Sequence, residues 1–265
     1  MKKIILPTLA VIFTLSAFAQ PKPPPPQEPV APDSQWLVND RKRPVPEQVL
    51  PGDMPLLAPD DADIIFDGQD MDALETSKGE PCNWVIEKGE LVTTKGTIRT
   101  KKAYGSVQLH AEYFIAEGTE GRDQKRGNGG IFMMGCFEIQ IHDSWENPTY
   151  ADGIVGAVYG QTPPLVNAAK KPGQWQSIDI FFNAPQADEN GKVTEPARVT
   201  VLVNGVLVQN NTPILGPTKN RVATTYENFT VRDGKILFQD HVNNPPLRYR
   251  NIWVRPIGES HPLKN

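Results

Sequence analysis

The sequence predicts an all-β fold, a sandwich of two antiparallel sheets. From residue 63 onward, short runs with period-2 alternation are separated by turn residues. No segment shows a sustained 3.6-residue apolar period with helix caps, and the prolines lie mostly between the runs. Many short strands without crossover helices are typical of two packed antiparallel sheets.

The alternating runs predict eleven strands in chain order. In residues 106–115, for example, Val107, Leu109 and Ala111 share one face and leave the polar residues on the other. Asn204-Gly205 is the strongest hairpin signal, because both residues tolerate a positive φ. Residues 167–171 are expected to form one helical turn. The expected strands are 64–66, 84–86, 90–94, 106–115, 130–134, 137–142, 176–182, 199–203, 206–208, 235–239 and 249–254.

The first residues of the 265-residue chain have the pattern of an export signal. Lys2 and Lys3 precede an apolar run, and Ala17-Phe18-Ala19 is a small-x-small cleavage site. We therefore expect residues 1–19 to be removed. No later apolar run reaches the ~18 residues of a membrane span, so no transmembrane segment is expected. The mature protein is expected in the periplasm or outside the cell.

The remaining chain divides by composition. Residues 20–59 are expected to form an extended arm that leads into the domain, because a proline-rich segment buries little surface. Residues 60–258 are long enough for one core, and 259–265 form a tail. The net charge of −4 and pI of about 5.6 give no basic footprint, so nucleic acid is not an expected partner. Cys82 and Cys136 could pair, but two cysteines exclude a Cys-rich structural metal site.

Residues 128–143 carry the first candidate site. Glu138, Gln140 and His142 alternate with apolar residues, so one strand face presents a carboxylate, an amide and an imidazole. These groups are the components of a sugar-handling site, although a solvated sheet face would look the same. Strict alternation places Asp143 on the opposite face, whereas a one-residue bulge would bring it alongside Glu138 and Gln140.

The second candidate stretch lies near the C-terminus. His241 follows a predicted strand, and its intrinsic pKa near neutrality suits a general acid or base, the alternative being an ordinary loop histidine. Arg250 could bind a carboxylate or an enolate oxygen. Trp253 could stack on a sugar ring or belong to the core. His110 is expected at the surface or between the sheets.

Seven motifs, kept in order over about residues 60–257, together resemble the 3-keto-disaccharide hydrolase domain family. This family is a concanavalin A-like jelly roll common in exported bacterial proteins, so the resemblance implies that fold here. The motifs are IFDGQDMD (65–72), WVIEKGEL (84–91), GNGGIF (127–132), FEIQIHD (137–143), GAVYGQTPPLVNAAKKPGQW (156–175), VNG (203–205) and LFQDH with RYRNIWVRPI (237–241 and 248–257).

The sequence departs from the family pattern at five positions. Leu74 replaces a Trp, Gly129 a Ser, Phe137 a Tyr and Gln176 an Asn. His142 replaces an aliphatic residue on the face expected to line the site, which leaves the substrate open.

The resemblance implies the cleavage of 3-keto-glycosides. A ketone at sugar carbon 3 acidifies the hydrogen on carbon 2, so a base can remove it, the group on carbon 1 can leave, and water can add back. Glu138 and His241 are the implied acid/base pair, and Asp143 would orient His241 or a metal. Gln140 and Arg250 would orient the substrate or stabilise the enolate. The other implied substrate-binding residues are Asn128, His142, Tyr159 and Gln239.

The sequence leaves two points open. A divalent cation could polarise the ketone, but no ligand set is evident. A non-catalytic carbohydrate-binding module is the main alternative function, because jelly rolls perform both tasks. A structural surface protein tethered by the proline-rich arm is a third.

The composition of the arm predicts that it is dispensable for folding. A chain that begins at Asp60 should melt within about 2 °C of one that begins at Gln20, because surface changes contribute little to stability. Differential scanning calorimetry of the two chains measures this. A drop of many degrees would place the domain boundary earlier in the chain.

Overall fold

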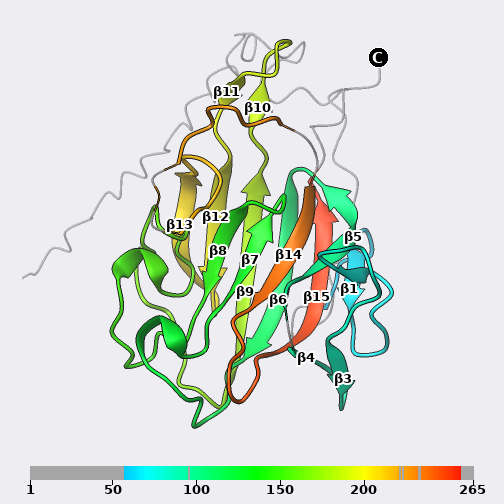
Figure 1. Cartoon of the computed structure of the whole chain (residues 1–265), viewed down its shortest axis with the longest axis vertical. Helices are drawn as coiled ribbons and strands as arrows, with labels where there is room; N and C mark the ends of the chain where they lie inside the picture. The colour runs from blue at the N-terminus through cyan, green and yellow to red at the C-terminus, as the bar shows by residue number, and fades with distance from the viewer. Residues whose placement is uncertain (1–56, 95, 221, 223, 232–233, 258–265) are drawn as a thin grey trace, which may run out of the picture. The chain divides into compact units, whose positions relative to one another are not determined.

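The computed structural model describes residues 57–94, 96–220, 222, 224–231 and 234–257 as two antiparallel sheets packed face to face (Figure 1). This confirms the predicted sandwich. The expected signal sequence, the arm up to residue 56 and the tail lie outside the described residues. None of the helices in the described ranges is long and apolar enough to cross a membrane.

One sheet has eight strands in the order β13-β12-β9-β6-β15-β4-β3, with β1 paired to β15. Every pairing in it is antiparallel. Its strands are β1 (Asp63–Phe66), β3 (Val85–Glu87), β4 (Glu90–Val92), β6 (Val107–Phe114), β9 (Trp175–Asn183), β12 (Arg198–Val203), β13 (Val206–Pro213) and β15 (Arg248–Pro256).

The other sheet has five strands in the order β2-β5-β14-β7-β8. Figure 1 shows β7, β8 and β14 as a layer over β6, β9 and β12 of the larger sheet. The five strands are β2 (Leu74–Thr76), β5 (Ile98–Tyr104), β7 (Gly129–Met133), β8 (Phe137–Ile141) and β14 (Gly234–Asp240), and a separate ribbon pairs β10 (Gln186–Ala187) with β11 (Val193–Glu195).

The hairpin predicted at Asn204-Gly205 is present, and a second hairpin of the same kind joins β3 to β4. Lys88 and Gly89, with φ of 54° and 78°, join β3 to β4. Asn204 and Gly205, with φ of 52° and 76°, join β12 to β13. Positive φ at both central residues matches the right-handed twist of the paired strands, which is why Asn-Gly and Lys-Gly end these strands sharply.

The fold differs from the sequence-based prediction in one helical turn and in four strands that were not predicted, β2, β5, β10 and β11. The expected helical turn at 167–171 is wrong, because this segment is irregular, and the short helices are 3-10 turns η1 (Asp123–Lys125) and η2 (Ala151–Gly153). Strand β5 was not predicted, because the charged residues in Arg-Thr-Lys-Lys at its centre hide its alternation. Its register with β14 is also irregular.

The core lies between the sheets and is made of the apolar half of each alternating strand. Phe137, Ile139 and Ile141 of β8 are fully buried, as are Ile178 and Ile180 of β9. Burial of each such side chain is worth about 1.5–3 kcal/mol. Alternation then forces the other half of β8 onto the outer face of the five-stranded sheet. Cys82 and Cys136 are not joined by a disulfide.

Phe137 should be among the costliest core residues to truncate. Its ring lies 5.7 Å from that of Phe182, 6.0 Å from Tyr226 and 5.5 Å from Phe229, measured between centroids. Phe137→Ala should lower the free energy of unfolding by about 3–5 kcal/mol and the melting temperature by roughly 10 °C. The exposed Leu215, changed to Ala, is the control and should shift neither quantity measurably. Equal melting temperatures for the two variants would contradict this core assignment.

Candidate active site

A cavity of about 700 Å³ lies over the outer face of the five-stranded sheet. Its strand residues alternate with core residues: Glu138 and Gln140 come from β8, and Gln239 comes from β14. Six of the nine residues that the sequence predicted for the site line it, namely Asn128, Glu138, Gln140, Tyr159, Gln239 and His241. One concave surface therefore gathers residues from three separate parts of the chain.

The register of three neighbouring strands arranges these side chains in rows. Gly130 of β7 lies between Gln140 and Gln239, and Phe132 is paired with Glu138. A Cβ atom at Gly130 would lie 2.5 Å from Glu138 Oε1. A side chain at position 130 would therefore displace the carboxyl group of Glu138 from the place that it occupies next to Gly130.

Glu138 is the buried titratable group of this cavity. Its side chain is only 6 % exposed, and burial raises its pKa to about 8. Transfer of a carboxylate out of water disfavours the charged form, so Glu138 carries a proton at neutral pH. A buried carboxylic acid that opens into a cavity is a suitable general acid.

The side-chain amide of Gln140 can adopt two orientations. In one, Nε2 donates to Gln124 Oε1 and Asn128 Oδ1, each at 3.2 Å. In the other, the nitrogen donates to Glu138 Oε1 and to the Gly129 carbonyl, also at 3.2 Å. The first orientation presents the amide oxygen to protonated Glu138, and the second presents a donor to its carboxylate.

His241 is the first residue after β14 and remains open to solvent at the cavity wall. Desolvation of its ring lowers its pKa, and the neighbouring Asp240 carboxylate opposes this shift. The ring is therefore neutral at pH 7 and can accept a proton. Strand spacing and rise place the Cα atoms of Glu138 and His241 roughly 15 Å apart. Both side chains line the same cavity of about 700 Å³, Glu138 from β8 and His241 from the end of β14.

Two amide residues of the cavity, Asn128 and Gln239, differ in how they are hydrogen-bonded. Asn243 fixes the backbone of Asn128 by accepting from its N–H at 2.9 Å and donating to its carbonyl at 2.8 Å. Gln239 presents a buried Oε1 atom that has no hydrogen-bond partner among the described residues. A buried acceptor without a partner costs free energy, which a ligand hydroxyl group would recover.

Tyr159 lies at the cavity wall with residues that the sequence did not indicate. Its hydroxyl is 2.7 Å from that of Tyr150 and donates to Asn220 Oδ1 at 3.3 Å. Most of these lining residues come from loops without a periodic pattern, so no local signal identifies them, whereas Phe132 belongs to the predicted strand β7 and shares a face with Gly130. The lining residues that sequence reasoning missed are 122–125, Phe132, Tyr150, Thr218 and Asn220.

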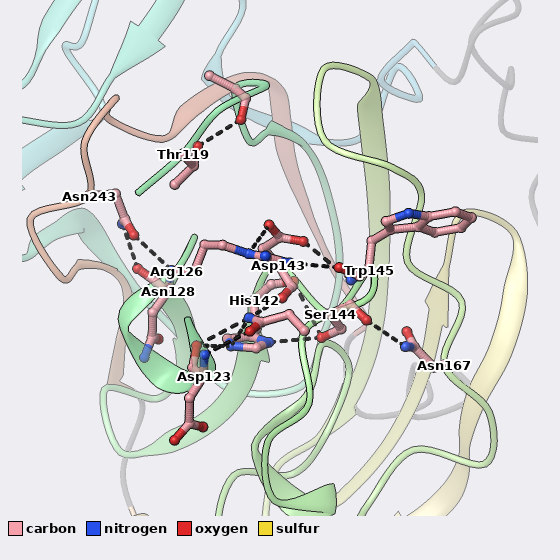
Figure 2. Close-up of polar contacts among 12 residues, drawn as sticks. Thr119, Asp123, Arg126, Asn128, His142, Asp143, Ser144, Trp145, Asn167 and Asn243 are labelled. Carbon is pink, nitrogen blue, oxygen red and sulfur yellow. Dashed lines mark hydrogen bonds and ion pairs between the residues drawn. The ribbon is translucent and has the colours of Figure 1, made fainter. Parts of the chain in front are cut away.

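Asp143 lies outside the cavity, which corrects the expectation that it orients His241 or a metal. The pairing of β7 with β8 continues without a bulge, so alternation turns Asp143 away from Glu138. Its Oδ2 atom lies 2.7 Å from Arg126 Nε and it is 2 % exposed. Asp143 therefore forms a buried ion pair (Figure 2).

Arg250 and His142 also do not line the cavity, so their expected contacts with substrate are not supported. Arg250 belongs to β15 of the eight-stranded sheet, where Nε pairs with Glu112 Oε2 at 2.6 Å and the guanidinium stacks 4.1 Å from the Trp175 ring centroid. His142 is fully buried, and both of its ring nitrogens are hydrogen-bonded within the protein. Trp253, 3 % exposed, is buried against His110.

The described part of the chain contains no preformed cluster of metal ligands. No group of three or more His, Cys, Asp and Glu side chains there is arranged to hold an ion. The protein itself supplies a protonated carboxyl, a neutral imidazole and five amide side chains around one cavity, together with the charged side chains of Arg122, Asp123 and Lys125.

Solved structures with the same architecture include candidate glycosyl hydrolases from Parabacteroides distasonis. One is 38% identical in sequence, with a TM-score of 0.77, over 83% of this chain and 95% of that chain. A second is 21% identical, with a TM-score of 0.53, over 74% of this chain and 99% of that chain, and shows the fold alone. A comparison with curated proteins finds no match.

The described sandwich also coincides with a family model. Residues 61–255 match the model of the 3-keto-alpha-glucoside-1,2-lyase-like domain, and this range includes every cavity residue and both sheets except Pro256, the last residue of β15. The match spans well over half of the chain, and the 38% identical structure agrees with it. The chain therefore belongs to the 3-keto-alpha-glucoside-1,2-lyase-like family of glycosyl hydrolase-like jelly-roll domains.

Proposed function

We propose that the protein is an exported enzyme that cleaves 3-keto-glycosides by elimination across sugar carbons 1 and 2, followed by addition of water. The observation that carries this proposal is the pair of Glu138 and His241 in one cavity, with opposite protonation tendencies. Burial keeps Glu138 protonated and His241 neutral, so the cavity holds an acid and a base at the same pH. The family match supports the choice of substrate.

In the first half of the reaction, neutral His241 removes the proton from carbon 2. The carbon 3 ketone accepts the electron pair as an enolate, which then forms the double bond between carbons 1 and 2 as the bond from carbon 1 to the aglycone oxygen breaks. Glu138 donates its proton to that oxygen, and the aglycone leaves as an alcohol. General acid and general base catalysis each contribute typically ~10²–10⁴-fold.

The second half returns the site to its starting state. Glu138, now a carboxylate, takes a proton from water as the hydroxyl adds to carbon 1, and the imidazolium of His241 returns a proton to carbon 2. The products are a free 3-keto sugar and the alcohol, and both residues regain their original protons. Release of the unsaturated sugar before water addition would make the same site a lyase.

The amide row supports both halves of the reaction. Gln140 can turn its nitrogen toward Glu138 Oε1 at 3.2 Å, which would stabilise the carboxylate formed after proton donation. The side chains of Asn128 and Gln239 line the same cavity and can bond to sugar hydroxyls or to the enolate oxygen. The requirement for a ketone follows from the chemistry, because an unmodified glycoside has no acidic hydrogen at carbon 2.

Substitution of the two titrating residues tests the mechanism. Glu138→Gln keeps the shape but cannot donate a proton, so kcat on a 3-keto-glucoside should fall ~10²–10⁴-fold. His241→Asn should lower kcat by a similar factor. The double variant should lower kcat by less than the product of the two single effects. Release of a chromogenic aglycone measures all three.

Glu117→Gln makes the same chemical change at a side chain that is 75% exposed, and should retain full activity. Normal turnover by Glu138→Gln would remove this residue from the mechanism. Hydrolysis of the unmodified glucoside would indicate direct displacement chemistry. If the wild type binds keto-sugars but cleaves none, the protein is a binding module.

The pKa of about 8 for Glu138 also predicts a pH dependence of stability. A glutamate in the unfolded chain titrates near 4.3, so between these values the folded state holds one more proton and its stability falls as pH rises. Urea unfolding at pH 5 and pH 9 should show wild type losing a few kcal/mol relative to Glu138→Gln, which has no such proton. Parallel pH profiles for the two proteins would show that the carboxyl is not held in its acid form.

A further inference from the structure

The segment 122–126, whose residues 122–125 form one wall of the cavity, has only two backbone hydrogen bonds within itself, from Lys125 N–H to the Arg122 carbonyl at 3.1 Å and from Arg126 N–H to the Asp123 carbonyl at 3.3 Å. Arg122, Gln124 and Lys125 line the cavity, and η1 contributes only three residues to this wall. Arg122, at the start of the turn, makes no side-chain cap hydrogen bond. Asp123 has a φ of 56°, a left-handed conformation that is unfavourable for most residues. Contacts from outside the segment therefore contribute to its position.

His142 supplies the first of these contacts from beneath the wall (Figure 2). Its Nε2 atom lies 3.0 Å from the Asp123 carbonyl oxygen, and its Nδ1 atom lies 2.9 Å from Ser144 Oγ. A carbonyl oxygen only accepts, so Nε2 carries the hydrogen and Nδ1 accepts from the serine hydroxyl. Burial lowers the pKa of His142, which favours this neutral form.

Asn147 supplies the second contact with Asp123. Its Oδ1 atom accepts from the Asp123 N–H at 2.7 Å, and its Nδ2 atom donates to the Asp123 carbonyl at 3.2 Å. Both backbone polar groups of Asp123 are thus bonded to buried side chains. At the end of the segment, Arg126 is anchored by its ion pair with Asp143 at 2.7 Å.

The wall in turn contacts other residues that line the cavity. The carbonyl of Gln124 accepts from Asn128 Nδ2 at 2.8 Å, and its Oε1 atom accepts from Gln140 Nε2 at 3.2 Å. Its own Nε2 atom donates to Thr149 Oγ1 and to the Gly153 carbonyl, each at 2.9 Å. A displacement of Asp123 would therefore move the neighbouring Gln124 out of the amide row.

We propose that His142 is a positioning residue: through the bond from Nε2 to the Asp123 carbonyl, it holds the 122–126 wall in the place where the wall binds substrate. The expected effect of His142 on the kinetics rests on the proposed function. Its structural role rests on the hydrogen bonds alone. Glu138 and His241 lie on or next to strands β8 and β14 and not on this wall. Loss of the bond should therefore affect substrate binding more than the chemical step.

Two substitutions separate the bond from the bulk of the ring. The amide nitrogen of Gln can reach the position of Nε2, whereas the shorter amide of Asn reaches only that of Nδ1. His142→Asn should raise KM for a 3-keto-glucoside by roughly tenfold with kcat changed less than about threefold, because one buried hydrogen bond is worth on the order of tenfold. His142→Gln should restore KM to within about threefold of wild type.

Hydrogen exchange measures the same bond without any substrate. Amides of residues 122–126 should exchange faster in His142→Asn but not in His142→Gln, while those of β7 and β8 keep their protection. His110→Asn is the control, because His110 is an equally buried histidine of the eight-stranded sheet, bonded to Asp179. It should lower the melting temperature but change neither KM nor exchange of the wall.

Three results would overturn the proposal. If the amides of residues 122–126 exchange at the wild-type rate in His142→Asn, the His142 hydrogen bond does not hold the wall. Equal effects of Asn and Gln would assign the effect to lost ring packing, and faster exchange throughout β7 and β8 would assign it to general destabilisation. If no keto-glucoside is cleaved even by wild type, the proposed function fails, and the exchange experiment alone still decides the role of His142.

Discussion

The site depends on one constraint, the strict two-residue alternation of β8. Phe137, Ile139 and Ile141 are fully buried between the sheets, and this forces Glu138 and Gln140 onto the outer face. A slip of one residue would place a carboxyl group in the core and aromatic side chains in the cavity. The core packing that holds the sandwich together therefore also aims the proposed catalytic carboxyl, so that stability and function share one strand register.

The energetic character of the cavity follows from the burial of Glu138. Glycine at position 130 leaves space for the carboxyl group next to β7, and the resulting desolvation raises its pKa to about 8. Such a group destabilises the folded state at neutral pH, and the apolar core beneath it must offset that cost. The same desolvation provides a proton donor at a pH where an exposed glutamate would be ionised.

Polar residues that adjoin one another in sequence perform separate tasks here. Gln140 faces the cavity, His142 bonds to the Asp123 carbonyl below the wall, and Asp143 pairs with Arg126. His142 and Asp143 thus anchor the 122–126 segment at two places, Asp123 and Arg126. In the eight-stranded sheet, Arg250 is likewise engaged by Glu112 and unavailable to the cavity. Polar composition thus marked the correct region, and tertiary contacts divided it between chemistry and support.

The sequence by itself determined the sandwich, its hairpins and the outward direction of Glu138 and Gln140, because alternation and positive-φ turns are properties of neighbouring residues. It also predicted six of the residues that line the cavity. Only the tertiary structure decided that 122–125 and Tyr150 complete the cavity and that Asp143, His142 and Arg250 lie outside it. Those assignments depend on which loops and strands meet across long sequence separations, and no local pattern encodes such pairings.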